Sequence, residues 1–214
     1  MNVLRHSICI ALSFAALAPA SAKTLTIGID LSGSSPVTVP KFAKLAATAA
    51  SKEIAALKPG DFVYVRTIGD RGFANIPFKK IRIDRRNSAK DVAALIGGYI
   101  AALPSKPIEA QGSTHLLSFL TYGREFGCAS GDGKIWLITD GIEHSELISS
   151  KALLSGGALP NPKPEYLAGC SVTFFPLGAT SQSNISSASI DKMQAAWETY
   201  FKIAGASFDP VRLY

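Results

Sequence analysis

The chain has 214 residues, of which 47% are hydrophobic and 18% are charged. This length suits one domain with a sizeable buried core, and the composition excludes an intrinsically disordered chain. The formal net charge is +6, and no block that mixes aromatic and basic residues in the manner of RNA-binding proteins is present, so nucleic-acid binding is not expected.

Residues 1–22 have the pattern of a secretory signal peptide. Arg5 and His6 give a polar, basic start, an apolar run follows over residues 8–17, and Ala20-Ser21-Ala22 forms an A-x-A cleavage site. A buried amino-terminal helix is the alternative. The apolar run is too short for a bilayer, and no other stretch approaches the ~20 apolar residues that a membrane span needs. We expect cleavage after Ala22, a single domain over residues 23–214 without a membrane span, and a secreted or periplasmic location.

Cleavage would remove one cysteine and leave two, Cys128 and Cys170. An even pair in an oxidising compartment predicts a disulfide, with two free thiols or half of a metal site as the alternatives. Because the sequence has no CxxC pattern and only three histidines, a zinc site is not expected.

Strand and helix patterns alternate along the mature chain. The first half predicts a buried strand at 25–29, a helix at 42–57 ended by Pro59-Gly60, and a strand rich in β-forming residues at 62–68. Residues 79–86 predict a third strand with basic side chains on one face. We interpret these basic residues as protection of an edge strand, and a site for an acidic ligand is the alternative.

The second half continues the alternation. Ser88 and Asp91 form a capping-box pattern before an apolar helical stripe that ends at Leu103. Another helix is expected to start near Thr114, and the unbroken apolar run at 134–139 predicts a central strand. The remaining patterns indicate a weaker helix at 145–154, a strand at 171–175, and a last helix over 190–204 closed by Gly205.

This alternation predicts an α/β fold, a doubly wound and mostly parallel sheet with helices on both faces. Ligands of such sheets bind at the carboxyl edge, where the strand order reverses. Cys128 and Cys170 each precede a strand. If those two strands are adjacent and parallel, both cysteines lie at the opposite, amino end of the sheet.

Three motifs are expected to meet at the carboxyl edge: Asp30-x-Ser32-x-Ser34, Gly112-Ser113-Thr114 and Thr139-Asp140-Gly141. Each motif alone is more often a turn or a helix cap. Together they offer two carboxylates and three hydroxyls, and such an all-oxygen set suits a hard cation such as Mg²⁺. Because hydroxyls add no charge, a bound ion would still attract a carboxylate from outside.

Asp30, Ser32, Ser34, Thr114 and Asp140 together resemble the metal-ion-dependent adhesion site of the von Willebrand factor A domain family, over about residues 24–205. The resemblance implies strand order 3-2-1-4-5 with an antiparallel third strand at the edge. It implies that the three hydroxyls coordinate Mg²⁺ (or Mn²⁺ or Ca²⁺), that the two aspartates act directly or through waters, and that an acidic side chain of a protein partner completes the shell. Because the chain ends at Tyr214, the final strand and helix of the family are expected to be shortened or missing.

The leading functional hypothesis is therefore an exported, non-enzymatic binding module for metal-dependent protein recognition, within a bacterial envelope or secretion assembly. Glu143, His144 and His115 are expected at the rim of the site, where Glu143 would tune the choice of partner. The alternative is a metal-assisted hydrolase that uses His115 or His144 as general base. A scaffold with a vestigial metal site is the third hypothesis. An α/β-hydrolase is rejected because no Gly-x-Ser-x-Gly elbow is present.

Overall fold

The computed structural model describes residues 22–69, 78–106, 111–121, 123–128, 133–181 and 184–213. Residues 1–21, which hold all but the last residue of the predicted signal peptide, lie outside this range. Within the described residues, no helix is both long enough and apolar enough to cross a membrane.

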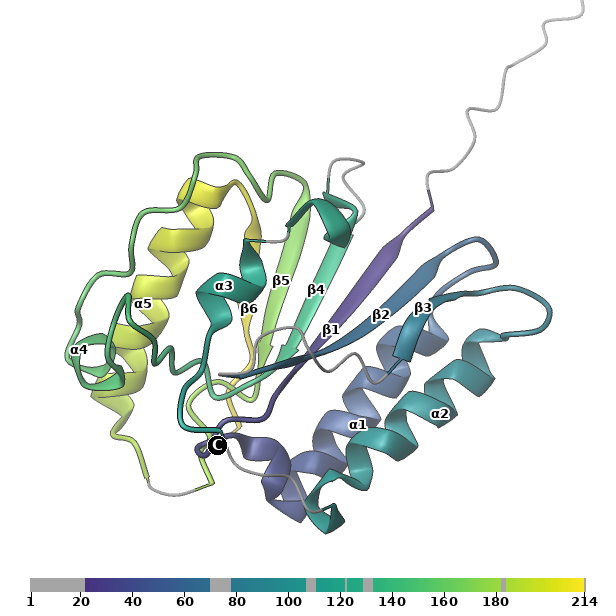
Figure 1. Ribbon diagram of the computed structural model, residues 1–214, viewed down its shortest axis with the longest axis horizontal. Helices are drawn as coiled ribbons and strands as arrows, with labels where there is room; N and C mark the ends of the chain where they lie inside the picture. The colour runs from purple at the N-terminus through teal and green to yellow at the C-terminus, as the bar shows by residue number, and fades with distance from the viewer. Residues whose placement is uncertain are drawn as a thin grey trace, which may run out of the picture.

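In the described part of the chain, six strands form one sheet in the order β3-β2-β1-β4-β5-β6 (Figure 1). The antiparallel strand β3 pairs with β2 at one edge, and all the other neighbouring strands are parallel. The predicted α/β class and the order 3-2-1-4-5 are thus confirmed. The strands are β1 Thr24–Asp30, β2 Phe62–Ile68, β3 Phe78–Arg82, β4 Gly133–Ile138, β5 Cys170–Phe175 and β6 Ser207–Pro210.

Helices cover both faces of the sheet, as Figure 1 shows. One face packs against α1 (Pro40–Ala55) and α2 (Ala89–Ala101). The other face packs against α3 (Leu116–Leu120), α4 (Ser150–Leu154) and α5 (Ser187–Ala204). Three short 3-10 helices complete the described helical segments: η1 Pro36–Thr38, η3 Leu103–Ser105 and η4 Gly123–Phe126.

The alternation of side chains along β1 separates the two cores. Ile27 and Ile29 are fully buried in the core beneath α1 and α2. Gly28 points to the other face, where an added Cβ would collide with the side chain of Leu137 and press on Phe119 of α3. The missing side chain therefore lets α3 approach β1 closely, and α3 directly follows the segment that carries Thr114.

Three predicted elements are shorter than expected. Strand β3 ends at Arg82 because the carboxylate of Asp84 accepts the amides of Arg86 and Asn87 at 2.8 and 2.9 Å and turns the chain. Helix α4 starts only at Ser150, since Ser149 caps it. Helix α3 starts at Leu116 rather than at Thr114.

The two edge strands of the sheet are β6 and the basic strand β3. A sixth strand is present but has only 4 residues. On β3 the side chains of Lys79, Lys80 and Arg82 are exposed, and the ammonium group of Lys80 lies 4.0 Å from the ring centroid of Phe62. Lys80 thus lies over the neighbouring strand β2, and the exposed charges of this edge strand agree with the interpretation that they protect it.

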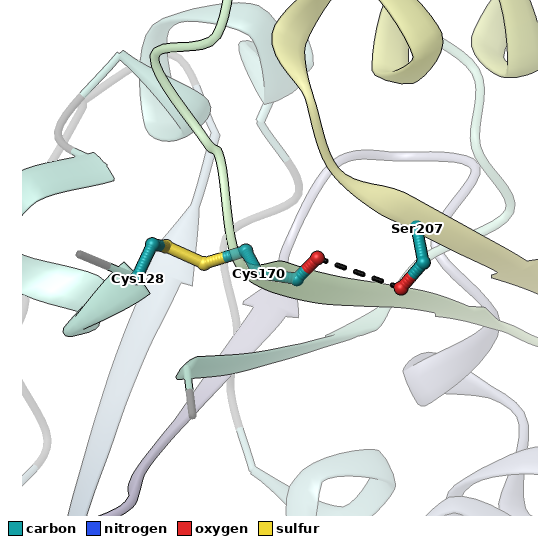
Figure 2. The surroundings of a disulfide bond; sticks show 3 residues. All are labelled: Cys128, Cys170 and Ser207. Carbon is teal, nitrogen blue, oxygen red and sulfur yellow. Dashed lines mark hydrogen bonds between the residues drawn. A yellow bond between two sulfur atoms is a disulfide. The ribbon is translucent and has the colours of Figure 1, made fainter. Parts of the chain in front are cut away.

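The predicted disulfide is present between Cys128 and Cys170. Figure 2 shows that it joins the turn before β4 to the first residue of β5, beside Ser207 at the start of β6. Because β4 and β5 are adjacent and parallel, both cysteines lie at the amino end of the sheet, as expected.

Candidate metal centre

The three predicted motifs lie at the carboxyl edge of the sheet and are connected by backbone hydrogen bonds. The amide of Gly33 donates to the carbonyl of Gln111 at 3.0 Å, which joins the first loop to the second. Thr114 and His144 exchange two backbone hydrogen bonds of 2.9 and 3.0 Å, which join the second loop to the third. The chain therefore holds these distant segments side by side.

Asp30 ends β1 and organises the first loop. Its side chain is fully buried: Oδ1 accepts the Ser32 amide at 2.8 Å, and Oδ2 accepts the Thr139 hydroxyl at 2.8 Å. The Ser35 hydroxyl donates to the Asp30 carbonyl at 2.6 Å and helps to close the turn. As a result the hydroxyl oxygens of Ser32 and Ser34 lie 3.5 Å apart.

Asp140 is a second fully buried carboxyl group at this edge. Its Oδ1 accepts the Ile142 amide at 2.9 Å, whereas Oδ2 is buried without a hydrogen-bond partner among the described residues. Burial raises the pKa of Asp140 well above its ordinary value, and the negative charge of Asp30 raises it further. The Ile142 amide and the Ser34 hydroxyl act in the opposite direction.

The pKa of Asp30 is also raised by burial, while its hydrogen bonds with Ser32 and Thr139 lower it. Among the described residues, neither Asp30 nor Asp140 forms an ion pair with a basic side chain. The edge therefore contains two neighbouring buried acids that no basic side chain of the described residues pairs with.

The hydroxyl residues open onto a hollow of about 520 Å³ above these acids. Ser32, Ser34 and Thr114 line one side of it, and Ile142 and Leu154 are among the residues that line the rest. Three larger hollows, of about 560, 780 and 590 Å³, lie at the amino end of the sheet, beside Tyr166 and beside Arg212. None of the five predicted cation-binding residues lines any of the three, so the site is identified by its chemistry and not by its volume.

The donors at this edge fit a hard cation. In the described part of the chain, no three His, Cys, Asp or Glu side chains gather as metal ligands usually do, so a soft metal finds no matching cluster there. Two carboxylates and three hydroxyls supply oxygen alone, which Mg²⁺ prefers. A cation in the hollow would also offset the paired charges of Asp30 and Asp140.

The two histidines lie near this edge in different environments. His144 is exposed and lines the hollow, and its Nδ1 accepts the Ser150 amide at 3.3 Å. His115 is half-buried, with Nε2 3.0 Å from the Ser113 hydroxyl and Nδ1 3.9 Å from a carboxylate oxygen of Glu146.

The expectation that Glu143 lies at an exposed rim is wrong. Its side chain is 0% exposed, and Oε2 accepts the amide of Leu117 at 3.0 Å. The physical reason is that the first amides of α3 have no acceptor within the helix, and a buried carboxylate supplies one. A glutamate next to a histidine in a loop gives no sign of this arrangement in the sequence.

Two residues outside the predicted cation-binding set support the site. Thr139 holds Asp30 through its hydroxyl, and Ser35 accepts the Val37 amide at 3.3 Å while donating to the first strand. Thr139 stands within a motif already recognised, and Ser35 precedes a proline at the start of η1. A serine immediately before a proline is a helix-capping pattern, so Ser35 could have been identified.

No protein-family model matches the sequence, and no curated protein matches it. Several solved structures match the chain. An aerotolerance-related membrane protein from Bacteroides fragilis is 16% identical, with a TM-score of 0.46, and the match covers 89% of this chain and 92% of that one. A von Willebrand factor type A protein from Catenulispora acidiphila is 18% identical, with a TM-score of 0.42, and the match covers 91% of this chain and 39% of that one.

Proximal thread matrix protein 1 from the mussel byssus is also 18% identical, with a TM-score of 0.37. That match covers 86% of this chain and 47% of the mussel protein. The assignment of this chain to the mostly parallel, doubly wound α/β class rests on its own strand order and register.

Proposed function

We propose that the chain is a binding module of the von Willebrand factor A type, which uses one divalent cation to recognise a protein partner. The cation would be held by Asp30, Ser32, Ser34, Thr114 and Asp140. The observation that carries the proposal is the buried Oδ2 of Asp140, which has no hydrogen-bond partner among the described residues and belongs to a carboxyl group close to a second buried acid.

A buried carboxylate without a partner is unfavourable, so it either keeps its proton or acquires a cation. Three hydroxyls lining the hollow beside these acids favour the cation. Their oxygens can serve as ligands at about 2.1 Å from Mg²⁺, and the ion would complete an octahedron with waters. Mn²⁺ and Ca²⁺ have the same preference for oxygen and are the alternatives.

The ligand set leaves the ion able to attract a partner. Hydroxyls do not neutralise charge, and Asp30 and Asp140 do not line the hollow themselves. A carboxylate of another protein could therefore replace one of the waters on the ion. The apolar side chains of Ile142, Leu154 and Ile185 on the wall of the hollow favour an acidic residue with an apolar neighbour. With the predicted signal peptide, this role belongs in a cell envelope or secretion assembly.

Calorimetric titration of the protein with Mg²⁺ and Mn²⁺ tests the metal site. We expect one ion per chain, no measurable binding by Asp140→Asn, and unchanged binding by Asp191→Asn. The latter is a matched control because the side chain of Asp191 is 65% exposed and pairs with Arg212, away from the carboxyl edge motifs. Equal titration of the wild type and Asp140→Asn would remove the proposed site.

Partner recognition is tested by selecting a random peptide display library on the protein in Mg²⁺. The selected peptides should share an Asp or Glu beside an apolar residue, and a chelator should release them. Asp140→Asn should select no such motif. Peptides without an acidic residue, or peptides that resist the chelator, would show that binding does not pass through the cation.

A further inference from the structure

Glu143 is a buried acid that the proposed cation site does not use directly. Helix α3 has only 5 residues, and the side chain of its N-cap residue, His115, makes no capping hydrogen bond. The carboxylate of Glu143, 26 residues further along the chain, accepts the Leu117 amide at 3.0 Å instead. Burial raises the pKa of Glu143, and hydrogen bonds from the Ser145 side chain and from the amides of Leu117 and Leu116 act in the opposite direction.

His144, the residue after Glu143, holds the segment before α3 at a second position. His144 exchanges two backbone hydrogen bonds with Thr114, at 2.9 and 3.0 Å. Two consecutive residues of the third loop thus bind the chain on both sides of His115. Asp140 stands only three residues before Glu143. The segments that carry Thr114 and Asp140 are therefore fixed to each other by three hydrogen bonds.

We infer that Glu143 is a positioning residue for the cation site, which acts by holding the start of α3 so that the Thr114 hydroxyl faces the ion. The inference rests on the proposed function. Mg²⁺ requires near-ideal octahedral geometry, so a shift of Thr114 by a few tenths of an ångström weakens binding. Groups that orient metal ligands in this way typically contribute 10- to 100-fold in affinity.

Two substitutions separate this role from simple filling of space. Glu143→Gln keeps a carbonyl oxygen that can accept the Leu117 amide, whereas Glu143→Met has similar length but no such oxygen. We expect Mg²⁺ affinity by calorimetry to fall about 10-fold in Glu143→Met and less than about threefold in Glu143→Gln. Glu198→Gln is the control, because the side chain of Glu198 is exposed on α5 and accepts a hydrogen bond from Gln194, away from the Thr114 segment.

Amide hydrogen exchange supplies a second readout that does not need bound metal. In the absence of metal, Glu143→Met should speed exchange at Thr114 and His144 relative to Glu198→Gln. If the wild type fails to bind Mg²⁺, the proposed function falls, and this exchange measurement still decides whether Glu143 holds the Thr114 segment.

The inference is overturned if Glu143→Met keeps wild-type affinity, or if Gln and Met lose affinity equally. If Glu143→Met does not fold, amide hydrogen exchange of the wild type with and without Mg²⁺ tests the inference instead. Because coupling between the ion and the hydrogen bond is reciprocal, Mg²⁺ should slow exchange at Leu117 together with Thr114. Unchanged exchange at Leu117 would show that the Glu143 contact is only a helix cap.

Discussion

Asp30 and Asp140 give the proposed cation site its driving force, because both are fully buried and close enough for one charge to raise the pKa of the other. Folding brings them together without a basic side chain from the described residues to offset them. Without a cation, such a pair makes the folded state less favourable as soon as both acids ionise. The stability of the metal-free protein should therefore report on this pair.

Metal-free protein should lose stability as the pH rises above about 4. The folded pKa of Asp140 is raised, so the folded state binds the proton more tightly than the unfolded chain does. Through the interval between the ordinary and the raised pKa, the unfolded state releases its proton first, and the free energy of unfolding falls. Urea unfolding in chelator from about pH 4 to 8 measures this.

Asp140→Asn is the control for this pH dependence, since its amide oxygen can still accept the Ile142 amide. Its free energy of unfolding should exceed that of the wild type by an amount that grows with pH. Parallel curves for the two proteins would mean that the burial of Asp140 has no effect on stability.

Among individual residues, the sequence identifies those whose role follows from their own position along the chain. Asp30 and Asp140 directly follow apolar strands, so their place at the carboxyl edge could be predicted. Glu143 could not, because its burial depends on where the start of α3 lies in space, and α3 begins 27 residues earlier. A hydrogen bond of this range leaves no local pattern.

The helix α5 contributes to the site through Trp197. Its indole Nε1 donates to the carbonyl of Gly141 at 2.8 Å, next to Asp140. Trp197→Phe removes this donor and leaves a buried carbonyl unpaired, which should lower the free energy of unfolding by about 1–3 kcal/mol. We also expect a several-fold loss of Mg²⁺ affinity, measured by calorimetry, because the turn around Asp140 loosens.

Trp136→Phe is the matched control for this effect. Trp136 is 3% exposed and stacks on Phe175 in the core on the opposite face of the sheet. It should lower stability through lost packing while leaving Mg²⁺ affinity unchanged. If both variants change affinity equally, the contact from α5 has no special part in the site.

The disulfide between Cys128, in the turn after η4, and Cys170 of β5 should stabilise the fold without affecting cation binding. It closes a loop of 42 residues, for which chain entropy predicts about 3–4 kcal/mol. Unfolding of the double variant Cys128→Ser with Cys170→Ser should show this loss. Its Mg²⁺ affinity should equal that of the wild type, because both cysteines lie at the amino end of the sheet. A changed affinity would indicate coupling between the two ends.

The accuracy of each predicted element depends on how locally its ends are determined. Strand β2 was predicted at its observed bounds, because a run of β-forming residues is bounded on its amino side by the Pro59-Gly60 turn. Strand β3 ends before the predicted Arg86 because the Asp84 carboxylate turns the chain there. The helix at 145–154 was predicted too long, since its apolar spacing continues through the bend that precedes Ser149.

For the molecule as a whole, the alternation of strands and helices was sufficient to predict the class of fold. Parallel strands joined by right-handed crossovers allow few arrangements, and the family resemblance selected the order that is observed. The sixth strand was harder to predict. It contains Asp209 and Pro210, which are poor strand formers, and pairs with β5 only because the end of α5 brings it there.

The most direct test of the proposed cation site is a crystal of residues 23–214 soaked in Mn²⁺, with the anomalous signal recorded. We predict one strong peak, about 2.2 Å from the hydroxyl oxygens of Ser32, Ser34 and Thr114, with Asp30 and Asp140 coordinating it directly or through waters. An empty carboxyl edge, or a peak only at another place on the molecule, would contradict the account.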